Sequence, residues 1–133
     1  MKAIGARRTR GLNLGSYVDA ADNSGAKIVR VIAVKGGKSR KGQQISCGIG
    51  DLVKIDVKEG LKEVKKQIFW AVIIRQRMPY RRLTGERICF ESNAAVLLKD
   101  EIGNPKGTQV KGPVAREAAD RWPFIAKISS IVV

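Results

Sequence analysis

The sequence predicts an α+β protein that is mostly β: a small, closed, five-stranded β-barrel followed by short C-terminal helices. Five short segments with strand-type patterns are separated by turn-forming residues, at spacings typical of small barrels. Helix formers behind a proline occur only after residue 112. The 133 residues, 44% of them hydrophobic, suffice for one core. We therefore expect a single domain over residues 1–133, with a basic lead-in at 1–14, the barrel at 15–100, and a loop with short helices at 101–133.

The first half of the chain contains the lead-in and three predicted strands. Residues 1–14 place basic side chains among small residues, and we expect this segment to become ordered only on a partner. Residues 16–21 predict the first strand, which ends at the turn-forming sequence Asp-Asn-Ser-Gly. Residues 26–34 and 52–58 follow as strands, the second with apolar and charged residues in clean alternation. Between these two strands lies a glycine-rich basic loop at 36–44.

Residues 68–74 are seven consecutive apolar residues, rich in β-branched and aromatic types, which is typical of a strand buried on both faces. The arginine-rich segment 75–87 follows at once, with a turn signal within it at 83–86. Residues 88–90 then bring the chain back as a short strand. We interpret the whole stretch as a β-hairpin whose root lies in the core and whose tip is an arginine-rich arm in solvent.

The last third of the chain predicts one more strand and then helices. Residues 94–98 form the fifth barrel strand, and the glycines and proline of 100–107 indicate a loop. Residues 113–120 predict a helix that has its proline in the first turn. A second short helix or turn is expected at 123–129. Two aromatic side chains are expected to pack back onto the barrel, Trp122 and Phe124.

The charge balance indicates an anionic partner. Lys and Arg number 26 against 12 Asp and Glu, which gives a net charge of +14, and the pI is about 10.3. A charge of this size destabilises a folded chain through self-repulsion unless a partner screens it. RNA, DNA and an anionic membrane surface are the candidates. The arm is built from Arg, whose planar fork pairs bidentately with phosphate and stacks on bases, and this favours nucleic acid.

Nothing in the sequence predicts secretion or membrane insertion. No apolar run follows the basic N-terminal residues, so we expect no signal peptide. The longest apolar run, 68–74, is far too short to span a bilayer. Cys47 and Cys89 stand alone, without the spacing of a zinc site. We expect both to be buried, reduced thiols in a cytoplasmic protein.

The residue types that catalysis requires are not assembled in this sequence. It contains no His, which removes the commonest general base and metal ligand. The sequence Gly-Lys-Ser at 37–39 resembles the end of a phosphate-binding loop, but Ile32 stands where that motif needs a glycine. Four acids considered as Mg²⁺ ligands lie on separate turns and strand faces: Asp22, Asp51, Asp56 and Glu59. We therefore expect no enzyme activity, no cofactor and no metal site.

Basic residues recur in four separated clusters, which favours several elements of one large folded RNA as the ligand. Aromatic content is only 5%, so recognition of RNA backbone and shape fits better than reading of bases. Tyr80, inside the arm, is a candidate for stacking on a base. The predicted RNA-binding residues are Arg7, Arg8, Arg10, Lys27, Lys35, Lys38, Arg40, Lys41, Arg75, Arg77, Tyr80, Arg81, Arg82, Arg87, Lys106, Lys111 and Arg116.

Several motifs occur in order along residues 15–133. They are ADNSGAK at 21–27, GD at 50–51, the run 72–77 with Arg81, Arg82 and Gly85, NAAV at 93–96, PKGT at 105–108 and GPVARE at 112–117. This ordered set closely resembles the universal ribosomal protein fourteen family of the large subunit. The long N-terminal lead and the ending at 122–133 resemble the archaeal and eukaryotic branch more than the bacterial one.

The resemblance implies a five-stranded barrel with a small helical part, bound to large-subunit rRNA on the face of the cytoplasmic ribosome that meets the small subunit. It implies a contribution to intersubunit bridges. The implied partners are neighbouring large-subunit proteins, small-subunit rRNA across the interface and a subunit anti-association factor. By position, the arm 75–87 and the loop 35–41 match the segments expected to touch rRNA. Two alternatives are a free RNA-binding barrel that acts as a translation factor or RNA chaperone, and a metal-dependent RNA-processing enzyme.

Overall fold

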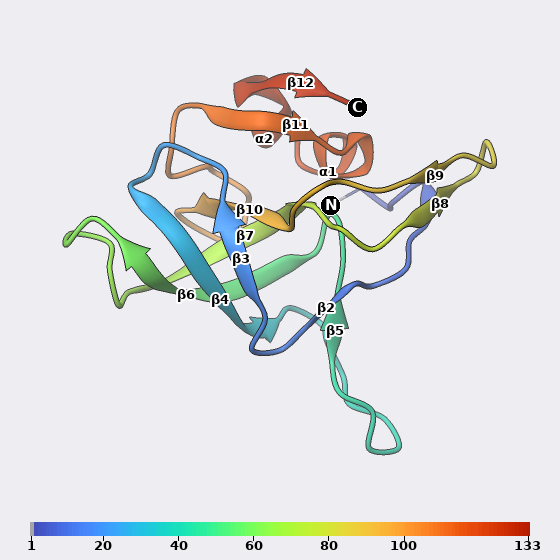
Figure 1. Cartoon of the computed structure of the whole chain (residues 1–133), viewed down its shortest axis with the longest axis horizontal. Helices are drawn as coiled ribbons and strands as arrows, with labels where there is room; N and C mark the ends of the chain where they lie inside the picture. Colours follow the sequence, from blue (N-terminus) through green and yellow to red (C-terminus); the bar gives the residue numbers. More distant parts are fainter. Residues whose placement is uncertain (1) are drawn as a thin grey trace.

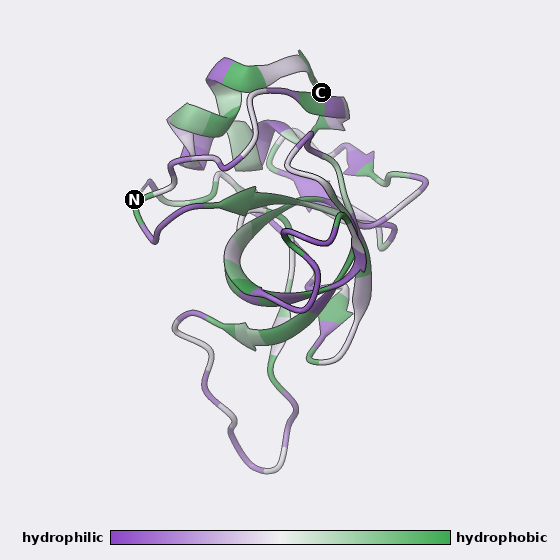
Figure 2. Cartoon of the chain, turned by 90° about the vertical axis from the view of Figure 1, so that its left-hand side faces the viewer, coloured by the Kyte–Doolittle hydropathy of each residue, from purple (hydrophilic) through white to green (hydrophobic). Residues whose placement is uncertain are grey.

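A closed β-barrel forms the centre of the structure, a computed structural model that describes residues 2–133. Its strands follow the spatial order β10-β3-β4-β6-β7, and Figure 2 shows them curling into a ring. They are β3 (Tyr17–Ala20), β4 (Ala26–Val34), β6 (Leu52–Gly60), β7 (Ile68–Arg75) and β10 (Ala94–Leu98). These are the five strands that the sequence predicts, with ends that differ by a few residues. The predicted fold class is therefore confirmed.

The barrel closes between its first and last strands. Neighbouring strands pair antiparallel from β3 through β4, β6 and β7 to β10. The ring is completed by a short parallel pairing of β10 with β3, in which Ala94 faces Asp19 and Ala95 faces Ala20. Because every strand then has two neighbours, no edge of this sheet remains open to pair with another chain.

Two strands of the barrel are buried on both faces. In β7, Ala71 and Ile73 belong to the cluster inside the barrel, while Val72 and Ile74 belong to a second cluster beneath the C-terminal elements. Strand β10 alternates in the same way and is buried along its whole length. This double burial explains the long apolar run that the sequence shows at 68–74, although Ile68 itself is 61% exposed.

The second cluster is covered by the C-terminal unit, which we define as residues 110–133. It contains β11 (Val110–Val114), α1 (Arg116–Arg121), α2 (Pro123–Ile128) and β12 (Ser129–Val132), and it lies at the top of Figure 1. Strands β11 and β12 pair in parallel. This pair was not predicted, and the prediction that Pro113 opens a helix is wrong, because Pro113 lies in β11 and faces Ile131. Trp122 packs inward as expected, whereas Phe124 is 41% exposed and does not.

The arginine-rich segment forms a small sheet of its own. Strands β8 (Tyr80–Arg82) and β9 (Arg87–Ile88) make a hairpin within it, and β1 (Ala6–Arg7) from the lead-in pairs with β8. The prediction that 68–74 and 88–90 form the two sides of one hairpin is wrong, because β7 pairs with β6 and β10. We call these three strands the arm sheet; it projects to the right in Figure 1. The remaining pair joins β2 (Leu12–Asn13) to β5 (Ser46–Cys47).

The lead-in is therefore held by the body of the protein, through β1 and β2. The prediction that it becomes ordered only on a partner is wrong for residues 2–14, and residue 1 lies outside the described residues. The prediction of two buried cysteines is half right: Cys47 is buried and Cys89 is exposed. None of the helices in residues 2–133 is long and apolar enough to cross a membrane.

Candidate nucleic-acid interface

The predicted RNA-binding residues separate into side chains that face solvent and side chains that hold the fold together. Arg8, Arg75 and Lys106 are half-buried, and Tyr80 and Arg82 are buried. The exposed members are Arg7, Arg10, Lys27, Lys35, Lys38, Arg40, Lys41, Arg77, Arg81, Arg87, Lys111 and Arg116. Only the exposed ones can reach a partner without a rearrangement of the protein.

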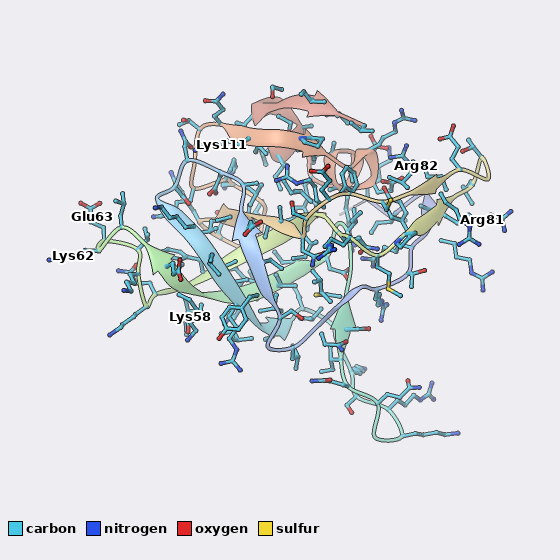
Figure 3. The ribbon with its side chains drawn as sticks, viewed as in Figure 1. Lys58, Lys62, Glu63, Arg81, Arg82 and Lys111 are labelled. Atoms are coloured by element: carbon cyan, nitrogen blue, oxygen red, sulfur yellow. The ribbon has the colours of Figure 1, made fainter. Side chains whose placement is uncertain are left out.

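Alternation along the arm sheet sets its two faces apart. In β8 the outer residues Tyr80 and Arg82 are buried and the middle residue Arg81 is exposed. Directly opposite residues in an antiparallel pair point to the same side, so Arg7 and Arg87, which face Arg81 from the two neighbouring strands, lie on the exposed face with it. In Figure 3, Arg82 lies close to α1 and Arg81 lies on the side of β8 away from the helices.

The buried face of the arm sheet carries a hydrogen-bonded network. Glu117, in α1, accepts a hydrogen bond of 2.7 Å from Arg82 Nε and one of 2.6 Å from the Tyr80 hydroxyl. Arg82 also donates from Nη2 to the Val133 carbonyl oxygen at 2.6 Å. The exposed fractions of the Arg82 and Glu117 side chains are only 9% and 6%. The network fastens the arm sheet to the C-terminal unit.

This network shifts the pKa values of its members. Burial raises the pKa of Glu117, but the hydrogen bonds from Arg82 and Tyr80 outweigh it and leave the pKa below its ordinary value. Burial and the neighbouring carboxylate together raise the pKa of Tyr80 well above its usual range. The ring of Tyr80 is 1% exposed, so the prediction that it is free to stack on a base is wrong.

Arg8 is held at the base of the arm sheet by an acid of the barrel. Its Nη1 lies 2.7 Å from Asp51 Oδ1 and donates a hydrogen bond of 2.8 Å to the Ile49 carbonyl oxygen. Arg121 approaches the same carboxylate at 3.8 Å, and the neighbouring Trp122 donates from its indole N–H to the Gly50 carbonyl oxygen at 2.9 Å. The positive charge of Arg8 is thus already paired within the fold.

Arg75 joins the end of β7 to the C-terminal unit. Its Nη1 donates to the carbonyl oxygens of Lys111 and Pro113 at 2.9 and 2.8 Å. Burial lowers the pKa of Arg75, although Asp19 opposes this effect. A Cβ at Gly112 would come within 2.7 Å of the same guanidinium, so the chain needs glycine there. Arg75 therefore links β7 to β11 of the C-terminal unit.

The basic loop 36–44 extends away from the barrel, at the bottom of Figure 1. Lys38, Arg40 and Lys41 are exposed along it. At its root the Gly37 N–H donates to the Val34 carbonyl oxygen of β4. Farther out its hydrogen bonds run within the loop: the Ser39 hydroxyl donates to the Gln43 carbonyl oxygen, and the Gln43 N–H donates to the Arg40 carbonyl oxygen. At the start of the loop, Lys35 pairs with Glu101 at 2.8 Å, and both side chains are about half exposed. The loop is thus a cationic projection with a surface ion pair at its root.

The remaining predicted cations are spread over several parts of the chain. Lys27 lies on the barrel, Lys106 in the loop before β11, and Lys111 and Arg116 in the C-terminal unit. Arg10 lies between β1 and β2, and Arg77 between β7 and β8. Lys27 and Lys111 border an open hollow of about 600 Å³ at one end of the barrel, together with Lys65. Lys106 lies 4.9 Å from the centre of the Phe69 ring, a cation–π contact that covers part of its surface. Arg116 is exposed at the start of α1. Figure 3 shows Lys111, in β11 of the C-terminal unit, far from Arg81.

Three of the four acids considered as metal ligands are committed to the fold, and the fourth, Glu59, is exposed at the end of the barrel. Asp22 is buried and accepts hydrogen bonds from the Ser24 hydroxyl and the Leu97 N–H. Asp51 pairs with Arg8, and Asp56 pairs with Lys58. Within residues 2–133, no three Cys, Asp or Glu side chains come together as a group that could hold a metal ion.

Glu117 is the residue with a clear role that sequence reasoning missed. The spacing of Tyr80 and Arg82 on one face of a strand is visible in the sequence. Their partner lies 35 residues beyond Arg82, in a helix whose position no local pattern reveals. Lys65 at the barrel end was missed as well, since it stands in a polar turn that reads as an ordinary connection.

Comparisons with known proteins agree on one family. The family model described as Ribosomal protein L14p/L23e matches residues 11–133. The large ribosomal subunit protein uL14 of Nanoarchaeum equitans is 51% identical over 133 residues, which is all of both chains. The protein of the same name from Thermoplasma acidophilum is 47% identical over the same span. That of Nitrosopumilus maritimus is 49% identical over 125 residues, 94% of this chain and 89% of the relative.

Proposed function

The chain belongs to the ribosomal protein L14p/L23e family, and from this premise we infer that it is a structural constituent of the large ribosomal subunit. The family and its archaeal branch are those that the sequence motifs indicate. Identity with the archaeal relatives runs over the full chain, including the lead-in and the ending. A structural, non-enzymatic role in translation follows, in which the protein binds rRNA and other ribosomal proteins.

The observation that best supports rRNA binding is the number of exposed cations that the fold leaves unneutralised. The net charge is +14, and the ion pairs within residues 2–133 use only a few of the basic side chains. Among residues 2–133, exposed cations that form no ion pair occur on the arm sheet, on the loop 36–44 and at the barrel end, where Asp22 and Glu59 also line the hollow. Contacts from three such projections would hold separate rRNA segments in register, with the rigid barrel fixing the distances between them.

The mode of recognition is contact with the backbone and shape of folded rRNA. Tyr80 in the arm sheet is buried and Phe69 beneath Lys106 is partly buried, whereas Tyr17 on β3 is 61% exposed. Stacking of bases on aromatic rings therefore has few platforms here. Phosphate contacts from Arg and Lys remain, and they make binding strongly dependent on salt.

We propose that the C-terminal unit faces protein neighbours and the small subunit. It leaves several apolar side chains in solvent, among them Phe124, Ile131 and Val132. Exposed apolar groups that lie together are typical of a surface that a partner covers. The candidate partners are neighbouring large-subunit proteins, small-subunit rRNA across the interface, where the unit would contribute to intersubunit bridges, and a subunit anti-association factor.

Ultraviolet cross-linking in cells, followed by sequencing of the attached RNA, tests the proposal. We expect cross-links confined to a few sites in large-subunit rRNA, carried by peptides from the loop 35–41 and the arm 75–87. Sedimentation of cell extracts on sucrose gradients gives the matching protein readout, with the chain in the large-subunit and whole-ribosome fractions. Cross-links spread over many messenger or small RNAs, with the protein outside ribosomes, would instead indicate a free RNA-binding barrel.

A further inference from the structure

We propose that Arg7, Arg81 and Arg87 form one composite site for adjacent phosphate groups of an RNA backbone. We call these three residues the arginine row. They come from three strands, one of them in the lead-in, and they stand side by side on the exposed face of the arm sheet. The inference rests on the proposed function and adds to it a defined subsite with a defined ligand chemistry.

The strand register places the three side chains in line. Arg7 faces Arg81 in the pairing of β1 with β8, and Arg81 faces Arg87 in the pairing of β8 with β9. Adjacent strands are about 4.8 Å apart, so the row is about 10 Å long at the backbone. Arginine side chains of this spacing can converge on one phosphate or extend to the next one along a strand of RNA.

Like charges directly opposite each other destabilise a sheet. Here three lie in one row, and within residues 2–133 no acidic side chain forms an ion pair with any of them. A surface that served solubility alone would carry positively and negatively charged side chains interspersed. The repulsion in the free protein indicates that an anion completes the row, and Arg in place of Lys favours an anion that accepts paired hydrogen bonds, as phosphate does.

Two shallow hollows border the row. One has a volume of about 220 Å³ and is lined by Thr9, Pro79 and Tyr80 together with the three arginines. The other, of about 160 Å³, is lined by Arg7, Arg81, Arg82 and Leu83. Both are smaller than the pockets that hold drug-sized ligands, which are roughly 300–1,000 Å³. Their size suits a phosphate group on an extended backbone.

The row is fixed in place from behind. Tyr80 and Arg82 alternate with Arg81 along β8, and both are bound to Glu117 on the buried face. The arm sheet cannot rotate its arginines inward without breaking these bonds. A site whose donors are already oriented loses less conformational freedom on binding, which strengthens the contact with phosphate.

The direct test compares the wild-type chain with the triple variant Arg7→Gln, Arg81→Gln, Arg87→Gln. The matched control is Lys62→Gln, Lys66→Gln, Lys99→Gln, which removes the same charge from exposed residues in the turn between β6 and β7 and directly after β10. Affinity for a large-subunit rRNA transcript is measured at several salt concentrations. We expect the row variant to bind on the order of 100-fold more weakly near 0.1 M salt, with the slope of log affinity against log salt reduced by about 2 to 3. The control variant is expected to bind the transcript only a few-fold more weakly than the wild-type chain.

The outcomes separate this inference from the proposed function. If the wild-type chain shows no salt-dependent binding to the transcript, the proposed rRNA binding fails and the row fails with it. The second outcome is that the wild-type chain binds and the rRNA affinity of the row variant falls no further than that of the control variant. In that case the arginine row is not a phosphate site, and long-range charge accounts for the binding. A row variant with full rRNA affinity that no longer binds an acidic ribosomal protein would also overturn the proposal.

A second measurement uses inorganic phosphate as the probe and needs no RNA. Thermal unfolding is followed in sodium phosphate and in sodium chloride of equal ionic strength. An anion that binds the folded chain raises its melting temperature, so we expect phosphate to raise that of the wild-type chain more than that of the row variant. Without phosphate, at low salt, the row variant is expected to melt at the same or a higher temperature, since repulsion has been removed. If phosphate raised the melting temperatures of the wild-type chain and the row variant equally, this would contradict the proposed phosphate site.

Discussion

At the scale of single residues, the most consequential group is a carboxylate that faces no ligand. Glu117 extends from α1 to the arm sheet and neutralises the buried guanidinium of Arg82. Removing one partner of a buried ion pair leaves the other charge desolvated and unpaired, which costs far more than losing a pair on the surface. Glu117 therefore determines whether the arm sheet can keep its position.

Replacing Glu117 with Gln tests this role. We expect the free energy of unfolding to fall by about 3–5 kcal/mol, because the Arg82 charge remains buried without its counter-charge. Urea denaturation followed by tryptophan fluorescence measures the change. The control is Glu101→Gln, which breaks the exposed pair with Lys35 and is expected to cost less than about 1 kcal/mol. Equal losses for the two variants would contradict the role assigned to Glu117.

The same residue gives stability a dependence on pH. Its pKa in the fold lies below the ordinary value of 4.5, so its contribution is present above that value and is lost as the pH falls through the lowered pKa. The contribution of Asp22 to the pH dependence of stability has the opposite sign, because burial raises its pKa. We expect the stability difference between the wild-type chain and Glu117→Gln to be constant near pH 7 and to shrink below about pH 4.5. A difference that grew on acidification would contradict this assignment.

The two cysteines should differ sharply in reactivity. Burial, reinforced by the Asp51 charge, raises the pKa of Cys47 to about 12, so almost no thiolate forms near neutral pH. Cys89 is exposed on the arm. With a thiol reagent such as Ellman's, we expect about one thiol per native chain to react quickly and the second only after denaturation. Cys89→Ser serves as the control, and rapid labelling of that variant would show that Cys47 is accessible.

At the scale of elements, patterns that depend on near neighbours were predictable and pairings between distant segments were not. The five barrel strands follow from alternation and turn residues, and four of the five pairings join barrel strands that succeed each other along the chain. Strands β11 and β12 were missed because they pair across two helices, and because Pro113 within β11 fits the first turn of a helix. The sheet formed by β1 and β8 was missed for the same reason.

The candidate nucleic-acid interface was also predictable only in part. The sequence locates the cations, but it does not reveal which of them the fold has already neutralised. Arg81 and Arg82 are neighbours of one type, yet Arg82 is 8% exposed and paired while Arg81 faces solvent. The difference depends on strand alternation and on an acid in a distant helix. Arg8, paired with Asp51, is a second case.

We expect the loop 36–44 to contribute little to the stability of the fold. Replacing residues 38–43 with Gly-Gly is expected to change the free energy of unfolding by less than about 1 kcal/mol, because the loop's hydrogen bonds beyond its root are internal. Affinity for rRNA is expected to fall, since three cations are lost. The full-length variant Lys38→Gln, Arg40→Gln, Lys41→Gln should lose the same affinity. A deletion that weakens binding when the charge variant does not would assign the effect to loop shape.

At the scale of the whole molecule, the net charge of +14 makes the free protein sensitive to salt. Repulsion between exposed cations opposes folding and is screened by added ions. We expect the melting temperature to rise by a few degrees between about 20 and 300 mM sodium chloride, measured by scanning calorimetry. Glu63→Gln adds one more unit of positive charge at an exposed position and should melt lower at low salt, converging with the wild-type chain at high salt. A melting temperature that fell with salt would contradict this account.

The parallel pairing of β3 with β10 also bears on how a newly made chain reaches this state. The barrel cannot close until Leu98 has left the ribosome that is making it, so for most of its synthesis the chain is an open sheet with exposed edges. Pairings between such distant segments form slowly. During that delay a strongly cationic, unfinished chain meets abundant RNA, and premature contact with the wrong RNA competes with folding. We therefore expect a chain that is kept away from RNA until the last strand is in place to fold in higher yield.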